Sequence, residues 1–208
     1  MECHGCRKSC STQRNNKVSS FLKWFRNDQS LPPQDSKKIP AIALVGMPNV
    51  GKSVLFNALT STYVTVSNYP GTTVEVSRGE MGLNGSLVRV IDTPGMYSLL
   101  PITEEEKVSR DLLFSEAINL VIHVVDAKNL GRMLPLTFQL IETGLPVLLA
   151  INMMDEAKQL GLQIKREHLQ MELGVPVVTM AAALNLGLTE LRERMWDYVN
   201  SNCLSRTY

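Results

Sequence analysis

The pattern of apolar and polar residues changes at residue 39. Beyond that point, short runs of valine, isoleucine and leucine alternate with longer segments of helical periodicity. The apolar runs predict strands over residues 41–45, 74–81, 87–91, 120–125, 147–151 and 175–178. The periodic segments predict helices over residues 52–59, 104–114, 132–142, 165–173 and 189–200. Several strands are apolar throughout, as a sheet covered on both faces requires, so the pattern predicts a doubly wound α/β fold.

The dipeptide Asn84-Gly85 separates the second and third predicted strands and favours a two-residue hairpin. A hairpin makes its two strands antiparallel, whereas helical crossovers make neighbouring strands parallel. We therefore expect a mostly parallel six-stranded sheet with one antiparallel edge strand and helices on both faces.

Residues 1–38 lack the alternation of strands and helices. They combine polar segments with Pro32-Pro33, which is typical of a linker. The predicted organisation is a flexible, cysteine-containing N-terminal extension and linker over residues 1–38, one folded domain over 39–200 and a C-terminal tail over 201–208.

Composition and charge argue against several classes of protein. A formal net charge of +1 argues against a strongly basic nucleic-acid binder. The longest apolar runs, at residues 117–125 and 145–151, are too short to cross a bilayer, and the N-terminus lacks the apolar core of a signal peptide. The 4 cysteines do not make a disulfide framework. We therefore expect a cytoplasmic protein with reduced thiols.

Two features of the N-terminal extension are candidate binding elements. Cys3, His4, Cys6 and Cys10 suit zinc or iron, and a redox-exposed tail without metal is the alternative. Residues 21–26, FLKWFR, are aromatic and basic, and they suit a membrane surface, a partner helix or docking onto the folded domain.

The segment GMPNVGKS, from Gly46 to Ser53, joins the first predicted strand to the first predicted helix and has the spacing of a phosphate-binding loop. Side chains are absent at Gly46 and Gly51, where the backbone must wrap around a polyphosphate. Lys52 brings a positive charge to the outer phosphates, and the Ser53 hydroxyl is a candidate Mg²⁺ ligand. The alternative is an ordinary glycine-containing turn between a strand and a helix, but such a turn does not require the Lys-Ser pair.

Asp92-Thr93-Pro94-Gly95 follows the third predicted strand. An aspartate at this strand end can hold Mg²⁺ through water, and the Gly95 amide can approach the outermost phosphate. This tetrapeptide alone is a common turn, but its spacing from the phosphate-binding loop favours a role in the site.

Asn152-Met153-Met154-Asp155 follows the fifth predicted strand and resembles the guanine-reading motif Asn-Lys-x-Asp. The Asp155 carboxylate can accept hydrogen bonds from the guanine ring N–H and the exocyclic amine, a pair that adenine does not offer. Because Met153 replaces the usual lysine, we expect weaker nucleotide binding or faster exchange. An N-cap role for the asparagine or aspartate is the alternative.

Two adjacent threonines, Thr72 and Thr73, follow Pro70-Gly71 between the phosphate-binding loop and Asp92. A nucleotide switch needs a threonine here that senses the outermost phosphate and Mg²⁺. Both residues qualify from the sequence.

Met96 stands after Gly95, where the water-orienting glutamine of Ras-like proteins belongs. Methionine cannot hydrogen-bond a water molecule, so we expect slow intrinsic hydrolysis unless another group or ion helps. The Asn49 amide oxygen, beside the phosphates, suggests a monovalent cation as that helper in place of an arginine.

Longer stretches carry a family resemblance: GMPNVGKSVLFNALT, VSNYPGTTVEVSRGE, IDTPGMYSLLPITEEEKVSRDLL, VVDAKNLGRMLPLTFQLIETGLPVLLAINMMDEAKQLG and LGVPVVTMAAALNLGL. In these stretches the chain resembles the cytosolic GTPase domain of the FeoB ferrous iron transporters, over about residues 39–199. The resemblance implies a Ras-like P-loop GTPase fold, with Thr73 as the switch threonine and Asn49 as the potassium-coordinating residue. Ala181-Ala182 match a base-contacting Ser-Ala loop, and alanine for serine removes a hydroxyl from the guanine site.

The resemblance implies a switch domain that binds and hydrolyses GTP with Mg²⁺, is stimulated by K⁺, and regulates or drives ferrous iron uptake through a membrane transporter. The family continues into a helical regulatory domain and a transmembrane domain, whereas this chain ends at Tyr208. A fragment and a stand-alone homologue both stay open. The implied partners are guanine nucleotide and a transporter domain, in the same chain or another, at the inner face of the cell membrane. No nucleic acid is expected, and a homo-oligomer stays open.

Two other functions stay open from the sequence. GTPases of the TrmE–Era type, which act in RNA or ribosome maturation, share the phosphate motifs, but they usually carry Asn-Lys-x-Asp and an RNA-binding appendage. The third alternative is a nucleotide-binding interaction module with negligible turnover.

The predicted site combines these residues. Catalytic roles are assigned to Asn49, Lys52, Thr73 and Gly95. Mg²⁺ is assigned to Ser53, Thr73 and Asp92, and K⁺ to Asn49. Nucleotide contacts are predicted at Gly46, Asn49, Val50, Gly51, Lys52, Ser53, Val54, Gly71, Thr72, Thr73, Asp92, Thr93, Pro94, Gly95, Asn152, Met153, Asp155, Ala181, Ala182 and Ala183.

Overall fold

A computed structural model describes residues 39–60 and 62–204 of the chain. Its sheet has seven strands in the order β2-β3-β4-β1-β5-β6-β7. The strands are β1 Ala41–Val45, β2 Thr62–Asn68, β3 Glu75–Leu83, β4 Ser86–Asp92, β5 Ile118–Asp126, β6 Val147–Asn152 and β7 Val177–Thr179. The helices are α2 Lys52–Leu59, α3 Glu104–Ser115, α4 Leu130–Glu142, α5 Met154–Gln159, α6 Arg166–Leu173 and α7 Leu188–Leu204. Two 3₁₀ turns, η1 Ala127–Asn129 and η2 Ala182–Leu184, complete the elements.

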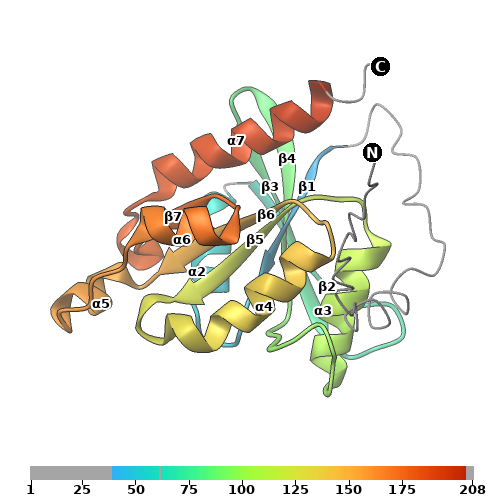
Figure 1. Cartoon of the computed structure of the whole chain (residues 1–208). Helices are drawn as coiled ribbons and strands as arrows, with labels where there is room; N and C mark the ends of the chain where they lie inside the picture. The colour runs from blue at the N-terminus through green and yellow to red at the C-terminus, as the bar shows by residue number, and fades with distance from the viewer. Residues whose placement is uncertain (1–38, 61, 205–208) are drawn as a thin grey trace, which may run out of the picture. The chain divides into compact units, whose positions relative to one another are not determined.

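Strand β1 lies at the centre of the sheet, and both of its faces are covered (Figure 1). Ile42 and Leu44 belong to the apolar cluster that α2 and α7 cover, whereas Ala43 and Val45 belong to the cluster under α3 and α4. This arrangement explains why β1 is apolar at every position. It also anchors the loop that follows β1 in the core of the domain.

The predicted α/β fold with helices on both faces is confirmed, and so is the hairpin at Asn84-Gly85. These two residues have φ values of 46° and 82°, as the tight antiparallel connection of β3 to β4 requires. Strand β3 is antiparallel to both of its neighbours, and β1, β4, β5, β6 and β7 run parallel.

The predicted number of six strands is wrong, because β2 extends the sheet beyond β3. Val64 and Val66 are 51% and 57% exposed, and the residues between and after them are exposed too. The strand is therefore held mainly by backbone hydrogen bonds at the sheet edge, because its alternating residues Val64 and Val66 are not buried against a core.

Other differences concern short elements and the ends of the chain. Helix α5 was not predicted, because its six residues are too few to show a helical period. Helix α7 continues to Leu204, past the predicted end at residue 200. The candidate metal ligands Cys3, His4, Cys6 and Cys10, the segment 21–26 and the predicted linker lie outside the described residues.

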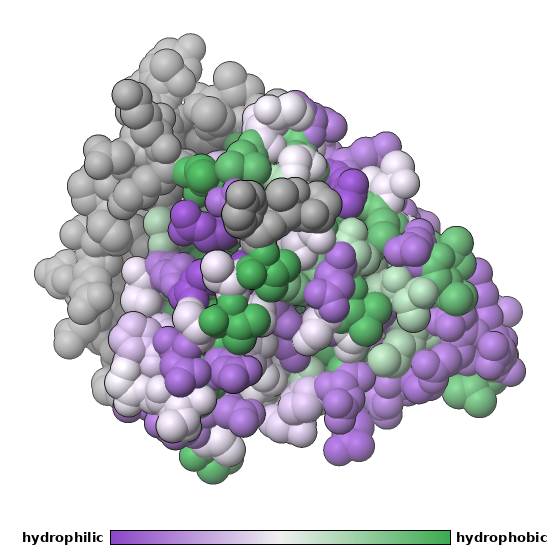
Figure 2. Space-filling view, turned by 180° about the vertical axis from the view of Figure 1, so that it is seen from behind, coloured by the Kyte–Doolittle hydropathy of each residue, from purple (hydrophilic) through white to green (hydrophobic). Residues whose placement is uncertain are grey.

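Exposed apolar side chains form separate patches between hydrophilic residues on the face drawn in Figure 2. Single exposed apolar residues of this kind are normal for a folded domain. Within residues 39–60 and 62–204, none of the helices has both the length and the apolar composition that a membrane span requires.

His123, in β5, is a fully buried titratable side chain. Its Nδ1 atom lies 2.9 Å from Thr137 Oγ1 on α4, and its Nε2 atom is buried without a hydrogen-bond partner. Burial lowers the pKa of His123 from 6.5 to about 3, and the positive charge of Lys52 acts in the same direction. The folded domain therefore holds a neutral imidazole at pH values where the unfolded chain binds a proton.

The buried imidazole should make stability depend on pH. Because the folded pKa lies below the unfolded pKa, the contribution is fully present above pH 6.5 and is lost as the pH falls toward 3. We expect the free energy of unfolding of the wild type to fall between pH 7 and pH 5. About 2 kcal/mol of this fall should come from His123 and should be absent in His123→Leu. Urea unfolding at both pH values measures this difference. Equal losses in the two proteins would contradict the prediction.

Candidate functional site

The predicted site residues come together at the carboxyl end of the parallel strands. The phosphate-binding loop follows β1, the segment Asp92–Gly95 begins at the end of β4, and Asn152–Asp155 begins at the end of β6. Residues 181–183 follow β7. Ligands of doubly wound sheets bind at this edge, so the topology brings together motifs that are far apart in the sequence.

Both glycines of the phosphate-binding loop have positive φ values and no room for a side chain. A Cβ atom on Gly46, at φ 153°, would lie 2.3 Å from the Val124 carbonyl oxygen. A Cβ atom on Gly51, at φ 89°, would lie 2.4 Å from Asn152 Nδ2. The sequence predicted glycine here for the approach of a phosphate. The structure adds a second reason, which is the packing of the loop against β5 and the loop after β6.

Lys52 carries a buried positive charge in this loop. Its Nζ atom donates to the carbonyl oxygens of Gly46, at 3.1 Å, and Met47, at 2.9 Å. Burial lowers the pKa of Lys52, and the nearby Asp92 carboxylate opposes that shift. An ammonium group has three N–H donors, so one N–H remains for an anion at the mouth of the loop.

Ser53 and Asp92, two of the predicted Mg²⁺ ligands, are in direct contact. Ser53 Oγ donates to Asp92 Oδ2 at 2.7 Å, and Asp92 Oδ1 is buried without a hydrogen-bond partner. Burial raises the pKa of Asp92, while the hydrogen bond from Ser53 and the charge of Lys52 lower it. A hydroxyl and a carboxylate oxygen fit Mg²⁺, which is bound in nucleotide sites by few protein oxygens together with phosphate.

No cluster of three or more His, Cys, Asp or Glu side chains suited to a metal occurs in the described part of the chain. The Ser53–Asp92 pair remains the candidate cation site, with nucleotide oxygens completing the shell.

The segment Asp92–Gly95 packs directly on the phosphate-binding loop. A Cβ atom on Gly95 would lie 2.6 Å from Pro48 Cγ, so only glycine fits this contact. Thr93 is buried, and its hydroxyl donates to the Leu44 carbonyl at 2.8 Å. The Met96 amide donates to the Gly46 carbonyl at 3.1 Å, while its side chain is fully buried in the core. Met96 therefore does not present a side chain to the site.

The two candidate switch threonines have different environments. The Thr72 hydroxyl donates to the Tyr69 carbonyl at 3.0 Å and accepts from the Val74 amide at 3.2 Å, so it closes a local turn. Thr73 is exposed and borders a cavity of about 630 Å³. The other lining residues are Val74, Glu75, Pro94, Thr103, Glu104 and Glu105. This difference favours Thr73 as the residue available to a ligand.

Other predicted contact residues lie around the loop in different environments. Asn49 is exposed at φ 63°, a left-handed conformation that asparagine tolerates. Val50 is buried, Val54 is 46% exposed on α2, and Gly71 is exposed at φ 79° in the switch segment.

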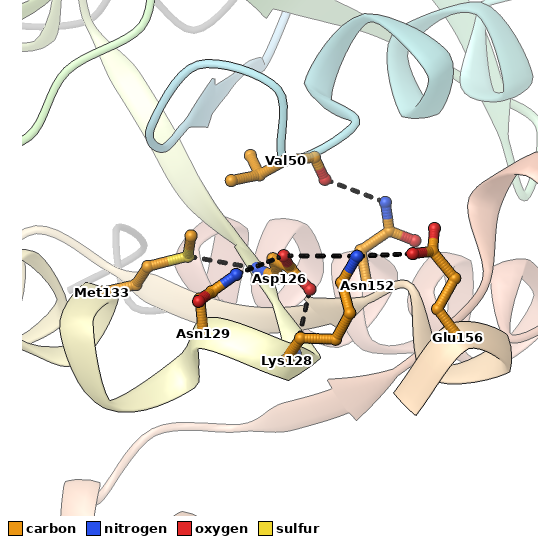
Figure 3. A network of polar contacts seen from close by, with 7 residues as sticks. All are labelled: Val50, Asp126, Lys128, Asn129, Met133, Asn152 and Glu156. Atoms are coloured by element: carbon orange, nitrogen blue, oxygen red, sulfur yellow. Dashed lines mark hydrogen bonds and ion pairs between the residues drawn. The ribbon is translucent and has the colours of Figure 1, made fainter. Parts of the chain in front are cut away.

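Asn152 joins the phosphate-binding loop to the loop after β7. Its Nδ2 donates to the Val50 carbonyl at 3.0 Å (Figure 3), and its Oδ1 accepts from the Ala182 amide at 2.9 Å. The side chain is 3% exposed. Its role in this structure is to hold these two loops at the end of β6, which the sequence motif alone did not reveal.

The remaining residues of the predicted guanine site surround this link. Met153 has a φ value of 61°, which is unusual for a residue other than glycine or asparagine. Asp155 lies in the first turn of α5 and is partly exposed. Ala181 and Ala182 are buried, and Ala183 is exposed. The Met154 amide donates to the Met180 carbonyl at 3.1 Å, so the segment that carries Asp155 lies beside the one that carries residues 181–183.

The Glu106 side chain forms a clamp on the segment after Gly95, between residues 97 and 103, which was not predicted from the sequence. The Glu106 carboxylate, from the first turn of α3, accepts hydrogen bonds from the amides of Tyr97 at 3.1 Å, Ile102 at 2.8 Å and Thr103 at 3.2 Å. Burial opposes ionisation, but the three amides outweigh it and lower the pKa of Glu106. The Thr103 hydroxyl accepts from the Glu106 amide, so the T-x-x-E spacing of a capping box was the available signal.

Residues 40–195 match the protein-family model described as ferrous iron transport protein B. Curated relatives include the Fe(2+) transporter FeoB of Helicobacter pylori strain J99, which is 45% identical over 141 residues. That alignment covers 68% of this chain and 22% of the relative. The FeoB of Escherichia coli K12 is 38% identical over 155 residues, covering 73% of this chain and 20% of the relative. The chain therefore spans about a fifth of the length of these relatives.

Two solved structures show the same architecture. The G domain of the T. maritima FeoB iron transporter has a TM-score of 0.72 and 41% identity, covering 78% of this chain and 99% of that one. An S. thermophilus NFeoB mutant bound to GDP has a TM-score of 0.71 and 43% identity, covering 75% of this chain and 61% of that one. The match therefore extends over nearly the whole of the T. maritima G domain.

The clamp predicts a specific loss of stability. Glu106→Gln removes the charge and places an amide NH₂ group against backbone N–H donors. We expect the free energy of unfolding to fall by about 1.5–3 kcal/mol, the range for hydrogen bonds to a charged group. Urea unfolding measures it, with Glu105→Gln, an exposed neighbour, as the matched control. If both variants are equally stable, the clamp contributes nothing.

Proposed function

The chain belongs to the ferrous iron transport protein B family, and from this premise we propose that it binds and hydrolyses GTP as a switch in ferrous iron uptake. The observation that carries the proposal is the phosphate-binding loop, where the buried Lys52 ammonium lies beside the Ser53–Asp92 pair. The relatives solved with GDP support a guanine nucleotide at this edge of the sheet.

The phosphate end of the nucleotide is assigned to residues 46–53. Lys52 neutralises the outer phosphates, and Ser53 and Asp92 hold Mg²⁺, which supplies positive charge between the phosphates when bound. The buried Asp92 Oδ1, which lacks a partner, supports this role. Gly95 brings its amide to the outermost phosphate, and Thr73 closes over it from the switch segment.

The base end is assigned to Asp155 and the alanines at 181–183. Asp155 accepts from the guanine ring N–H and the exocyclic amine, and the backbone of residues 181–183 borders the base. Asn152 holds these segments against the Val50 carbonyl, so the phosphate end and the base end keep a fixed spacing.

Hydrolysis needs positive charge near the bond that breaks, and the Met96 side chain is buried away from the site. We assign that charge to K⁺ held by the Asn49 amide oxygen. The exposed position of Asn49 at the tip of the phosphate-binding loop supports this assignment.

The relatives are named as Fe(2+) transporters and are several times longer than this chain. We propose that the domain acts on a membrane transporter part, in the same protein or a separate one, at the inner face of the cell membrane. Ferrous iron is the transported substrate in this proposal. Family membership disfavours the alternative role in RNA or ribosome maturation.

Phosphate release from GTP in Mg²⁺ tests the proposal. At constant ionic strength, we expect the rate to rise at least about tenfold when K⁺ replaces Na⁺, equivalent to roughly 1.4 kcal/mol of barrier. Asn49→Gly should abolish this rise with little change in GDP affinity, because glycine keeps the left-handed backbone and removes only the amide.

Two controls make the result specific. Asn185→Gly changes another exposed asparagine with positive φ, 57°, and should retain the stimulation by K⁺. Lys52→Ala should abolish hydrolysis in both salts, whereas Lys165→Ala, an exposed lysine, should not. Stimulation that persists in Asn49→Gly would assign the charge to another group, and full turnover in Lys52→Ala would refute the site.

A further inference from the structure

The guanine motif of this chain lacks its usual cation. Met153 stands where the motif has lysine, and its Cε atom lies 4.0 Å from the position of a Cβ atom added to Gly51. The methionine side chain therefore approaches the phosphate-binding loop without bringing a charge. Its backbone is strained at φ 61°, and α5 starts directly after it without a side-chain cap.

Helix α5, which carries Asp155, has six residues and needs support from its neighbours. The Met154 amide donates to the Met180 carbonyl at 3.1 Å, and Ala157 is fully buried. These contacts hold the start and the inner face of the helix. The outward side, where Asp155 and Glu156 lie, needs a further contact to fix the direction of the Asp155 carboxylate.

That contact comes from Lys128 in the η1 turn, which directly follows β5. Asp126 is 8% exposed, and its two carboxylate oxygens accept from the Lys128 amide and from Asn129 Nδ2, both at 2.9 Å. The Asp126 amide donates to Met133 Sδ at 3.2 Å. The η1 turn is therefore tied to β5 and α4 before the Lys128 side chain leaves it.

The Lys128 ammonium reaches α5 from this turn. It forms a hydrogen-bonded ion pair with Glu156, and its Nζ atom lies 3.9 Å from Asp126 Oδ2 (Figure 3). The hydrogen bond to Glu156 raises the pKa of Lys128, and the charges of Asp126, Glu156 and Asp155 act in the same direction. One ammonium therefore lies among the carboxylates that flank the predicted base-reading residue.

We propose that Lys128 is a positioning residue for guanine recognition: it supplies, from the η1 turn after β5, the cation that Met153 does not, and it orients Asp155 through Glu156. This inference rests on the proposed binding of guanine at Asp155. It adds a residue outside the motif, in the η1 turn, to the determinants of base selectivity.

The ratio of the dissociation constants of IDP and GDP tests this role. Inosine lacks the exocyclic amine, so the ratio reports the second hydrogen bond to Asp155, whereas a general loss of stability would weaken both nucleotides equally. Calorimetry in Mg²⁺ at low ionic strength should show that Lys128→Met and Glu156→Gln each reduce the ratio about threefold, as expected for a partly exposed ion pair. The reversed pair, Lys128→Glu with Glu156→Lys, should restore part of it.

Lys158→Met, which removes an exposed lysine from the same helix, should leave the ratio unchanged. If the wild type prefers GDP to IDP and Lys128→Met retains the full preference, the positioning role is wrong while the proposed function stands. If the wild type binds ADP as tightly as GDP, guanine recognition itself is wrong and the positioning role falls with it.

Discussion

The hydrogen bonds of the Asn152 side chain are the interaction on which the candidate site depends. One amide group holds the Val50 carbonyl of the phosphate-binding loop and the Ala182 amide of the loop after β7. Gly51 has no space for a side chain because this amide packs against it. The phosphate end and the base end of the proposed nucleotide site are thereby built as one unit, and Lys128 extends that unit to the outer side of α5.

Charge burial explains why the unit suits a nucleotide. Lys52 is buried with two carbonyl partners, and Asp92 keeps one buried oxygen without a partner. Isolated buried charges are costly, so a phosphate and a divalent cation would stabilise both groups. Hydrogen bonds hold both charged groups in place in this structure, and preorganised charges of this kind favour phosphoryl transfer.

The sequence predicted the features that depend on local spacing or on continuous burial. The phosphate-binding loop at residues 46–53 was recognised because its glycines, lysine and serine are the residue types that a polyphosphate site requires. Strands β1 and β6 were recognised because both of their faces are buried, which makes residues 41–45 and 147–151 apolar throughout. The strand β2 was missed because backbone pairing, not side-chain burial, holds it at the edge. Glu106 contacts backbone amides between residues 97 and 103, just before it in the chain, whereas Lys128 contacts Glu156 on a separate helix. A capping-box spacing hinted at the first, and no local pattern indicates the second.

In the proposed function, the site reads guanine through Asp155. Calorimetric titration of the wild type and of Asp155→Asn with GDP and ADP in Mg²⁺ tests it most directly. We expect the wild type to bind GDP at least about thirtyfold more tightly than ADP, since losing a charged hydrogen-bond pair costs roughly 2–3 kcal/mol. Asp155→Asn should lose that preference. Equal affinities of the wild type for GDP and ADP would contradict the account.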